Sequence, residues 1–137
     1  MKLPYILLAD SDSDHRESFV TVFEKQVAYA TILTVVDGQS LLSYLAGCPW
    51  KDMPSLIVLN YRQQDMTAPD VIRELLIDTR YLTIPKIVTT STEDENEIEE
   101  CRMLGIKNFL KEPAGLFDLE TNVRKIDNLL KTEFGLL

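Results

Sequence analysis

The sequence has few of the residues on which several classes of site depend. It contains two cysteines, one histidine and one tryptophan among 137 residues. Cys48 and Cys101 are too few and too far apart for a disulfide framework or a clustered metal site. Free thiols are expected instead, and they fit a reducing compartment such as the cytoplasm. No apolar run approaches the roughly 20 residues of a membrane span.

Positive charge is also scarce. The chain has 14 Lys and Arg against 22 Asp and Glu, which gives a net charge of −8. Nucleic acids and anionic membrane surfaces both need basic patches, so neither is expected as a partner. The first residues, MKLPYILLADSD, turn acidic after one short apolar run and do not read as a signal peptide. A cytoplasmic protein is therefore predicted.

Short apolar runs alternate with longer amphipathic ones along the whole chain. Strands are predicted at 3–9, 31–36, 56–60, 86–90 and 106–110. Helices are predicted at 13–28, 39–46, 69–78, 93–104 and 116–132. The fourth helix opens with a capping box, Thr92-Glu93-Asp94-Glu95, and ends at Gly105. The alternation predicts one α/β domain over 1–137, with a parallel sheet covered by helices on both faces.

Ligands of such open sheets bind beyond the carboxyl ends of the strands, so the residues at these ends are the candidates for a site. The first strand is followed by Asp10, Ser11 and Asp12, and the second by Asp37-Gly38, interpreted as a simple turn. The third strand ends at Asn60, the fourth at Thr90, and the fifth runs into Lys111-Glu112-Pro113.

Five segments in this order resemble the receiver domain of two-component response regulators, the CheY-like family. They are ILLADSDSDHR, VVDGQSLLSYL, LIVLNYRQQDM, PKIVTTS and NFLKEPAG, and together they cover almost the whole chain. The resemblance implies a flavodoxin-like (βα)5 fold of three layers with strand order 2-1-3-4-5. It also implies that Thr90 is the hydroxyl-bearing switch residue, that Phe109 is the switch aromatic, and that the peptide bond before Pro113 is cis.

Three positions depart from the family's pattern. The phospho-accepting Asp falls on Asn60, the second acid of the pair after the first strand falls on Ser11, and the Lys before the proline falls on Glu112. An amide cannot serve as a nucleophile for phosphoryl transfer. Divalent cations in phosphoryl-transfer sites need hard oxygen ligands, preferably carboxylates, and two are missing. Hence no cofactor and no metal are expected, with Asp10 and Asp12 left as the remaining candidate ligands.

Glu112, at the position where the family has a lysine, also disfavours a bound phosphoryl group. At about 4 Å, two unit charges interact by about 4 kcal/mol at an effective dielectric constant of 20, and Glu112 would repel a phosphoryl group. Neighbouring strand residues point to opposite faces, so Lys111 is expected to aim away unless a bulge intervenes. Asn60 is expected to hydrogen-bond with Thr90 or Asp10 and to hold one conformation, although it could also simply end a strand.

These features predict a pseudo-receiver that is not an enzyme. The expected role is that of a single-domain signalling module in a two-component or phosphorelay pathway, independent of phosphorylation and acting through protein contacts. The partner would be a histidine kinase or another signalling protein. It would bind the face formed by the predicted helix 93–104, strand 106–110 and helix 116–132. A homodimer is the other expectation. Glu99 and Glu100 in the acidic stretch 93–100 would steer it. Only EFGLL follows the last helix, so no output domain is expected in this chain. It would then act in trans as a single-domain module, or it has been cut from a longer protein.

Two alternatives concern the loop after the first strand. Asp10-Ser11-Asp12 also resembles the D-x-D motif of haloacid-dehalogenase-type phosphatases, with Asp10 as nucleophile and Asp12 as general acid, but their later lysine and acidic pair have no counterpart. A flavodoxin interpretation is disfavoured because the acidic loop offers no phosphate cradle.

Three other side chains carry simpler expectations. His15 is interpreted as a solvated residue, and Trp50 as covering the edge of the core or, alternatively, as an exposed anchor for a partner. Arg62 and Gln63 follow Asn60 and could reach over the pocket.

Overall fold

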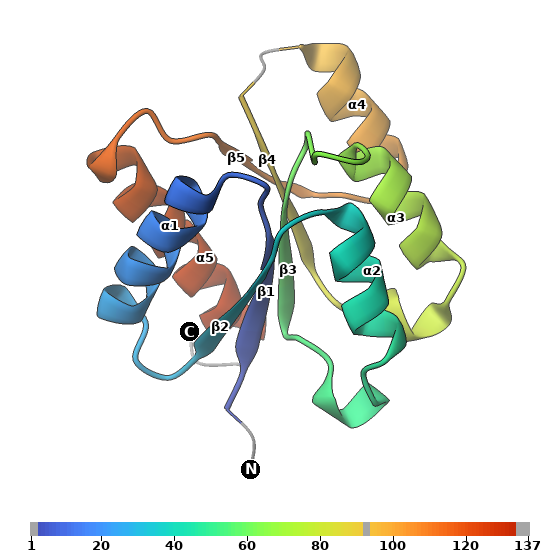
Figure 1. Cartoon of the computed structure of the whole chain (residues 1–137), viewed down its shortest axis with the longest axis horizontal. Coiled ribbons are helices and arrows are strands. Elements are labelled where there is room, and N and C mark those ends of the chain that lie inside the picture. The colour runs from blue at the N-terminus through green and yellow to red at the C-terminus, as the bar shows by residue number, and fades with distance from the viewer. Residues whose placement is uncertain (1–2, 92–93, 134–137) are drawn as a thin grey trace.

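The computed structural model describes residues 3–91 and 94–133. Five parallel strands form one sheet in the order β2-β1-β3-β4-β5, which confirms the predicted flavodoxin-like fold. The strands are β1 (Tyr5–Ala9), β2 (Thr31–Val35), β3 (Leu56–Asn60), β4 (Lys86–Thr90) and β5 (Asn108–Lys111). The helices are α1 (Ser13–Gln26), α2 (Gly38–Ala46), α3 (Ala68–Leu76), α4 (Glu95–Met103) and α5 (Leu116–Glu133), with 3-10 turns η1 (Trp50–Asp52) and η2 (Thr79–Tyr81). Helices α1 and α5 cover one face of the sheet, and α2, α3 and α4 cover the other (Figure 1).

Strand composition explains the strand order. The three nearly unbroken apolar runs form β1, β3 and β4, which lie in the middle of the sheet with helices over both faces. The more polar strands, β2 and β5, take the two edges, where most of their residues are at least partly exposed. The sequence pattern thus separates central from edge strands.

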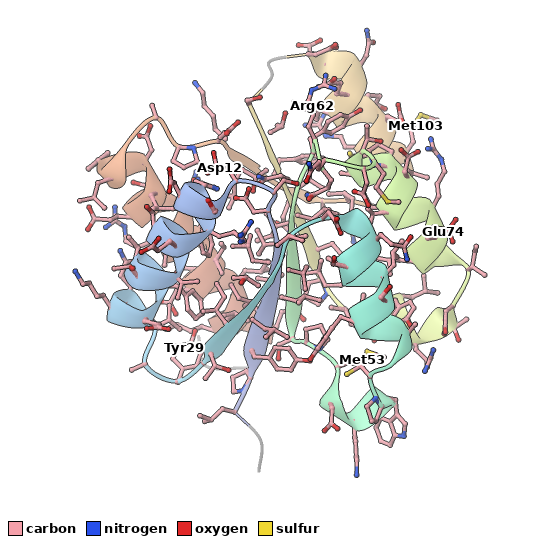
Figure 2. All side chains as sticks on the ribbon, in the orientation of Figure 1. Asp12, Tyr29, Met53, Arg62, Glu74 and Met103 are labelled. Carbon is pink, nitrogen blue, oxygen red and sulfur yellow. The ribbon has the colours of Figure 1, made fainter. Side chains whose placement is uncertain are left out.

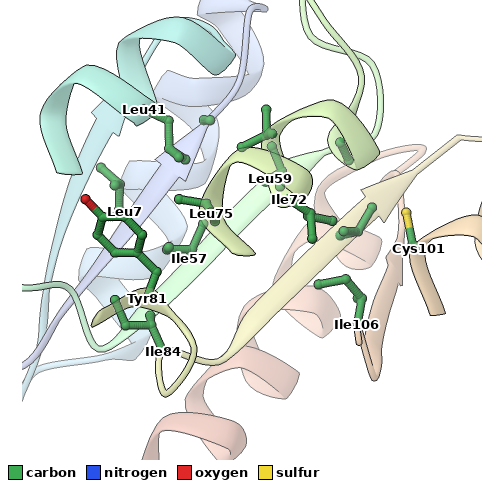
Figure 3. Packing of buried hydrophobic residues seen from close by; sticks show 14 of the residues in the cluster. Leu7, Leu41, Ile57, Leu59, Ile72, Leu75, Tyr81, Ile84, Cys101 and Ile106 are labelled. Atoms are coloured by element: carbon green, nitrogen blue, oxygen red, sulfur yellow. The ribbon is translucent and has the colours of Figure 1, made fainter. Parts of the chain in front are cut away.

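Alternate residues of the central strands enter two separate cores. Leu7, Ile57 and Leu59 pack against α2, α3 and α4, together with Leu41 and Ile72 (Figure 3). The opposite core joins Ile6, Leu8 and Val58 to the apolar faces of α1 and α5. Full burial of one such side chain contributes roughly 1.5–3 kcal/mol, so the two cores hold the strand ends in fixed positions.

Helix α4 differs from its prediction at both ends. It begins at Glu95, with the Asp94 carboxylate accepting a hydrogen bond from the Asn96 N–H at 2.9 Å; Thr92 and Glu93 of the predicted capping box lie outside the described residues. At the other end, Gly105 has a φ of 97°. The N–H of Ile106 then donates to the Cys101 carbonyl at 3.1 Å, a Schellman cap. Residue 106 therefore belongs to the cap, and β5 starts at Asn108 rather than at 106.

Several other predicted boundaries shift by one or two residues, and Asp37-Gly38 is more than a turn. Asp37 is the N-cap of α2, and its carboxylate accepts from the Ser40 N–H at 2.8 Å. A Cβ on Gly38 would lie 2.6 Å from Cγ of Met66, so only glycine allows the loop after β3 to approach this closely.

The bond before Pro113 is trans, so the cis expectation is wrong; trans is the intrinsically favoured form of an X–Pro bond.

The expectation for Trp50 and the expectation for membrane spans have different outcomes. Trp50 is 77% exposed in η1, at the amino-terminal end of the sheet, so the interpretation that it covers the core is wrong. Among the residues that the structure describes, no helix combines the length and the apolar character that a membrane crossing requires.

Candidate functional site

A cavity of about 290 Å³ opens at the carboxyl ends of β1, β3 and β4. This is the topological switch point of the sheet, where the strand order reverses: β2 pairs with one edge of β1, and β3 pairs with its other edge. Figure 2 shows Asp12 and Arg62 at this end of the sheet. The predicted residues that line it are Asp10, Ser11, Asp12, Asn60, Thr90 and Glu112, joined by Tyr61, Arg62, Thr89, Ser91 and Glu97.

Asp10 is engaged by the helix that follows it. Its carboxylate is 1% exposed, accepts from the Asp12 N–H at 3.0 Å through Oδ1, and is in hydrogen-bond contact with Nδ1 of His15 through Oδ2. His15 is thus half-buried with a side-chain exposure of 19%, and the expectation of a solvated residue is wrong. The hydrogen bond to Asp10 raises the pKa of His15 above its usual range, against the opposing effect of burial.

The position of His15 follows from helix geometry. Asp12 is the N-cap of α1 and accepts from the His15 N–H at 3.1 Å, which makes His15 the third residue of the helix. Side chains in a helix tilt toward its N-terminus, so the imidazole reaches back to the strand end. The spacing of five residues from Asp10, with a cap between them, is the sequence signal that could have revealed this contact.

Asp12 and Ser11 both serve local structure. The carboxylate of Asp12 caps α1, a role that acidic residues commonly take at helix N-termini. The hydroxyl of Ser11 accepts from the Gln64 N–H at 3.0 Å, which ties the β1 end to the loop after β3. Asp10, with contacts at both carboxylate oxygens, is therefore not the free carboxylate that a phosphatase nucleophile would require.

Asn60 ends β3 at the floor of the cavity, but its side chain does not make the expected bonds. Its Oδ1 is buried and has no hydrogen-bond partner among the described residues, and both carboxylate oxygens of Asp10 face other donors. The main-chain oxygen of Asn60 instead accepts from Nε2 of Gln63 at 2.9 Å. The same Nε2 lies 3.1 Å from the Ala9 carbonyl, so Gln63 joins the ends of β1 and β3 beneath the cavity rather than reaching over it.

The loop between β3 and α3 is held from several sides. Besides Ser11 and Gln63, the Asp65 carboxylate accepts from the N–H groups of Gly38 and Gln39 at 3.1 and 3.0 Å, at the start of α2. Arg62 reaches over the cavity as proposed, and its Nη2 lies 2.5 Å from Oε1 of Glu97 in α4. These contacts fix one arrangement of the loop that carries Asn60.

Glu112 lines the cavity at the position that the receiver pattern gives to a lysine, and Lys111 does not line it. The Glu112 N–H donates to the Thr90 carbonyl at 2.9 Å, which continues the β4–β5 ladder without a bulge. Lys111 is exposed, and its carbonyl accepts from Asn122 of α5 at 2.9 Å. No bulge therefore turns the Lys111 side chain into the cavity.

The β4–β5 side keeps the residue types of the receiver pattern. Thr90 is buried, with 8% exposure, at the end of β4. Phe109 is half-buried against the core beneath α4, and the guanidinium carbon of Arg102 lies 5.6 Å from its ring centroid. Phe109 and Pro113 do not line the cavity.

The acids of α4 are distributed over different sides of the helix. Glu99 approaches Arg102 on its own helix at 3.9 Å, next to Phe109 of β5. Glu100 pairs with Arg73 of α3 at 3.1 Å, so it stands toward α3. Exposed pairs like these contribute little to stability, typically 0–1 kcal/mol.

The fold class makes a divalent cation the obvious ligand to test against these side chains. The residues present do not fit one. The carboxylate of Asp10 faces His15 and Asp12, the neighbouring position is a serine, and β3 supplies a neutral amide. Within residues 3–91 and 94–133, no three His, Cys, Asp or Glu side chains gather as a metal site.

Solved structures with this architecture are response-regulator receiver proteins. The phosphorylated cyanobacterial phytochrome response regulator RcpA aligns with a TM-score of 0.83 and 20% identity over 94% of each chain. The Mn²⁺-bound response regulator Rcp1 gives 0.79 and 19% identity over 91% of this chain and 92% of that one. A two-component response regulator from Legionella pneumophila gives 0.79 and 23% over 96% and 99%. The chain has the receiver-domain fold.

Sequence comparison gives a weaker but concordant result. No family model matches the chain. A curated protein of Methanothrix harundinacea, described as the probable methanogenesis regulatory protein FilR2, is 22% identical over 123 residues, which is 88% of this chain and 79% of that protein. The solved structures show the fold that the chain shares, and the curated relative is a regulatory protein by its description.

Proposed function

We propose that this protein is a pseudo-receiver: a signalling module that works through protein contacts and does not depend on phosphorylation. The observation that carries the proposal is Asn60. It stands at the end of β3, on the floor of the switch-point cavity, where the receiver pattern requires a carboxylate. An amide offers no nucleophile for a phosphoryl group.

The surroundings of Asn60 support the same conclusion. Glu112 places a negative charge at the cavity where a phosphoryl group would need a positive one. The loop after β3 is tied to β1, α2 and α4, so it has little freedom to follow a bound group. We infer that one conformation is presented continuously.

The partner is proposed to be a histidine kinase or another signalling protein in a two-component pathway of the cytoplasm. Its binding face would be α4–β5–α5, where Glu99, Arg102 and Phe109 lie together. Glu100 contributes less directly to this binding face, since it pairs with Arg73 on the α3 side. A homodimer through the same face is a second possibility of this proposal.

The test is a pair of amide NMR spectra, recorded with and without beryllofluoride and magnesium, a mimic of the phosphoryl group. The proposal expects unchanged signals for Thr90 and Phe109. A phosphorylatable receiver domain under identical conditions serves as the positive control. Saturable shifts of Thr90 and Phe109 in this protein would contradict the proposal.

A further inference from the structure

The contact between His15 and Asp10 has a consequence for metal binding. Asp10 is the one acid that this chain keeps from the acidic pair of the receiver pattern, and both of its carboxylate oxygens make hydrogen-bond contacts within the chain. Oδ1 accepts the Asp12 N–H at 3.0 Å, and Oδ2 faces Nδ1 of His15. An ion that coordinates Asp10 would have to compete with these donors for the lone pairs of the carboxylate.

We propose that His15 is a built-in substitute for the metal cation, which holds Asp10 and keeps divalent ions out of the pocket. The inference deepens the proposed function and rests on it, since it concerns the same cavity. It adds a fourth departure to Asn60, Ser11 and Glu112, one that residue type alone did not reveal.

The packing around His15 keeps the imidazole in place. Its ring meets Phe19 edge-on, with centroids 6.5 Å apart, and its Nε2 is buried without a partner among the described residues. Nδ1 therefore makes the ring's one strong bond, and a proton on Nδ1 donates to Oδ2 in both the neutral tautomer and the charged form. An incoming ion would have to break this bond and leave a buried imidazole unpaired, which is unfavourable.

A second cationic side chain lies close to Asp10 but contacts only its main chain. Nη1 of Arg16 donates to the main-chain oxygen of Asp10 at 2.6 Å. It leaves the carboxylate oxygens untouched. Arg16 therefore separates two explanations: exclusion by positive charge near the pocket, and exclusion by occupation of Oδ2.

The experiment measures Mn²⁺ binding by electron paramagnetic resonance in a background that restores the missing groups. That background carries Asn60→Asp, Ser11→Asp and Glu112→Lys. His15→Ala is added to it in one variant and Arg16→Ala in a second, and circular dichroism verifies that each is folded. We expect His15→Ala to tighten Mn²⁺ binding at least tenfold, and Arg16→Ala to change it less than threefold.

The inference is overturned if His15→Ala leaves the affinity of the folded background unchanged, whether that affinity is measurable or absent. It is also overturned if Arg16→Ala produces the same gain, because charge alone would then explain the exclusion. The proposed function is tested separately on the unmodified chain: phosphoryl uptake by the wild type would refute it and leave the Mn²⁺ comparison of His15 intact.

Discussion

The two sides of the cavity differ in how far they depart from the receiver pattern. On the β1–β3 side, Ser11 and Asn60 replace acids, and His15 binds the acid that remains. On the β4–β5 side, Thr90 and Phe109 keep the expected residue types and lie at the expected strand positions. The side where the receiver pattern places metal and phosphoryl group differs from that pattern, whereas the side that faces the proposed partner surface keeps the residue types of the pattern at Thr90 and Phe109.

This difference places the altered charges and hydrogen-bonding groups at the ends of β1 and β3, whereas the residue types of the receiver pattern are kept at β4 and β5. Glu112 is the exception. It lies on the β4–β5 side, but its negative charge departs from the lysine of the receiver pattern. The predictions below compare the two sides, beginning with the largest expected effect.

Removal of the Asp10 carboxylate should produce the largest loss of stability. Asp10→Ala leaves His15 half-buried without its partner and also frees the Asp12 N–H. We expect the free energy of unfolding to fall by about 3 kcal/mol, as for other broken buried pairs. Thr90→Val, on the retained side, should cost about 1 kcal/mol, the net worth of a typical hydrogen bond. Urea denaturation of both variants at pH 6 measures the difference; equal losses would show that the two sides are not distinct.

Introduction of the missing acid should be unfavourable by itself. Asn60→Asp adds a carboxylate to a cavity that Asp10, Asp12, Glu97 and Glu112 already line. Like charges raise carboxyl pKa values, so we expect a loss of about 1 kcal/mol at pH 7 that disappears as the pH falls and the new group is protonated. Asn108→Asp, at the exposed start of β5, is the matched control and should change stability by under 0.5 kcal/mol. A pH-independent loss at position 60 would refute the electrostatic explanation.

The proposed partner face makes a kinetic prediction. Glu99→Lys reverses a charge beside Arg102 and Phe109, so the on-rate for a basic partner should fall roughly tenfold at low salt, and less at high salt. Glu17→Lys, exposed on α1, makes the same charge change on the opposite face of the sheet and serves as the control. Surface plasmon resonance with an identified partner compares the two. An unchanged on-rate for Glu99→Lys would place the interface elsewhere.

The smallest expected effect is a shift in the titration of His15, the only histidine of the chain. The hydrogen bond to Asp10 raises the pKa of His15, burial opposes this rise, and the charges of Asp10, Glu112 and Asp12 add to it. Because the folded pKa is the higher one, the stability from this group is complete below the unfolded value near 6.5 and is lost as the pH rises through the folded value. NMR of the imidazole carbon should show the raised pKa in the wild type and a lower one in Asp10→Asn. The same pKa in both proteins would contradict the contact.

Much of the fold could be predicted because it depends on local patterns. Three unbroken apolar runs indicated the central strands, and Gly105 indicated the end of α4. The ends of elements were less predictable where a cap takes residues from the next strand, as Ile106 shows. Trp50 was misplaced because composition does not say whether a loop has neighbours to cover an indole.

The candidate site was predictable in its residues but not in its contacts. Strand ends converge at one edge of a parallel sheet, so Asp10, Asn60, Thr90 and Glu112 could be brought together from spacing alone. The direction of His15 and the inward turn of Gln63 depend on helix start and loop geometry, which the residue types do not specify. The bonding of Asn60 was misjudged for the same reason, because Asp10 had a nearer donor.

The central claim is that the pocket does not accept a phosphoryl group, and intact mass spectrometry tests it most directly. The wild-type protein is incubated with acetyl phosphate and magnesium beside a phosphorylatable receiver domain as the positive control. We predict no stable mass increase in the wild type, since Asn60 offers no carboxylate. A stable gain of one phosphoryl group, located at Asp10 or Asp12, would contradict the claim.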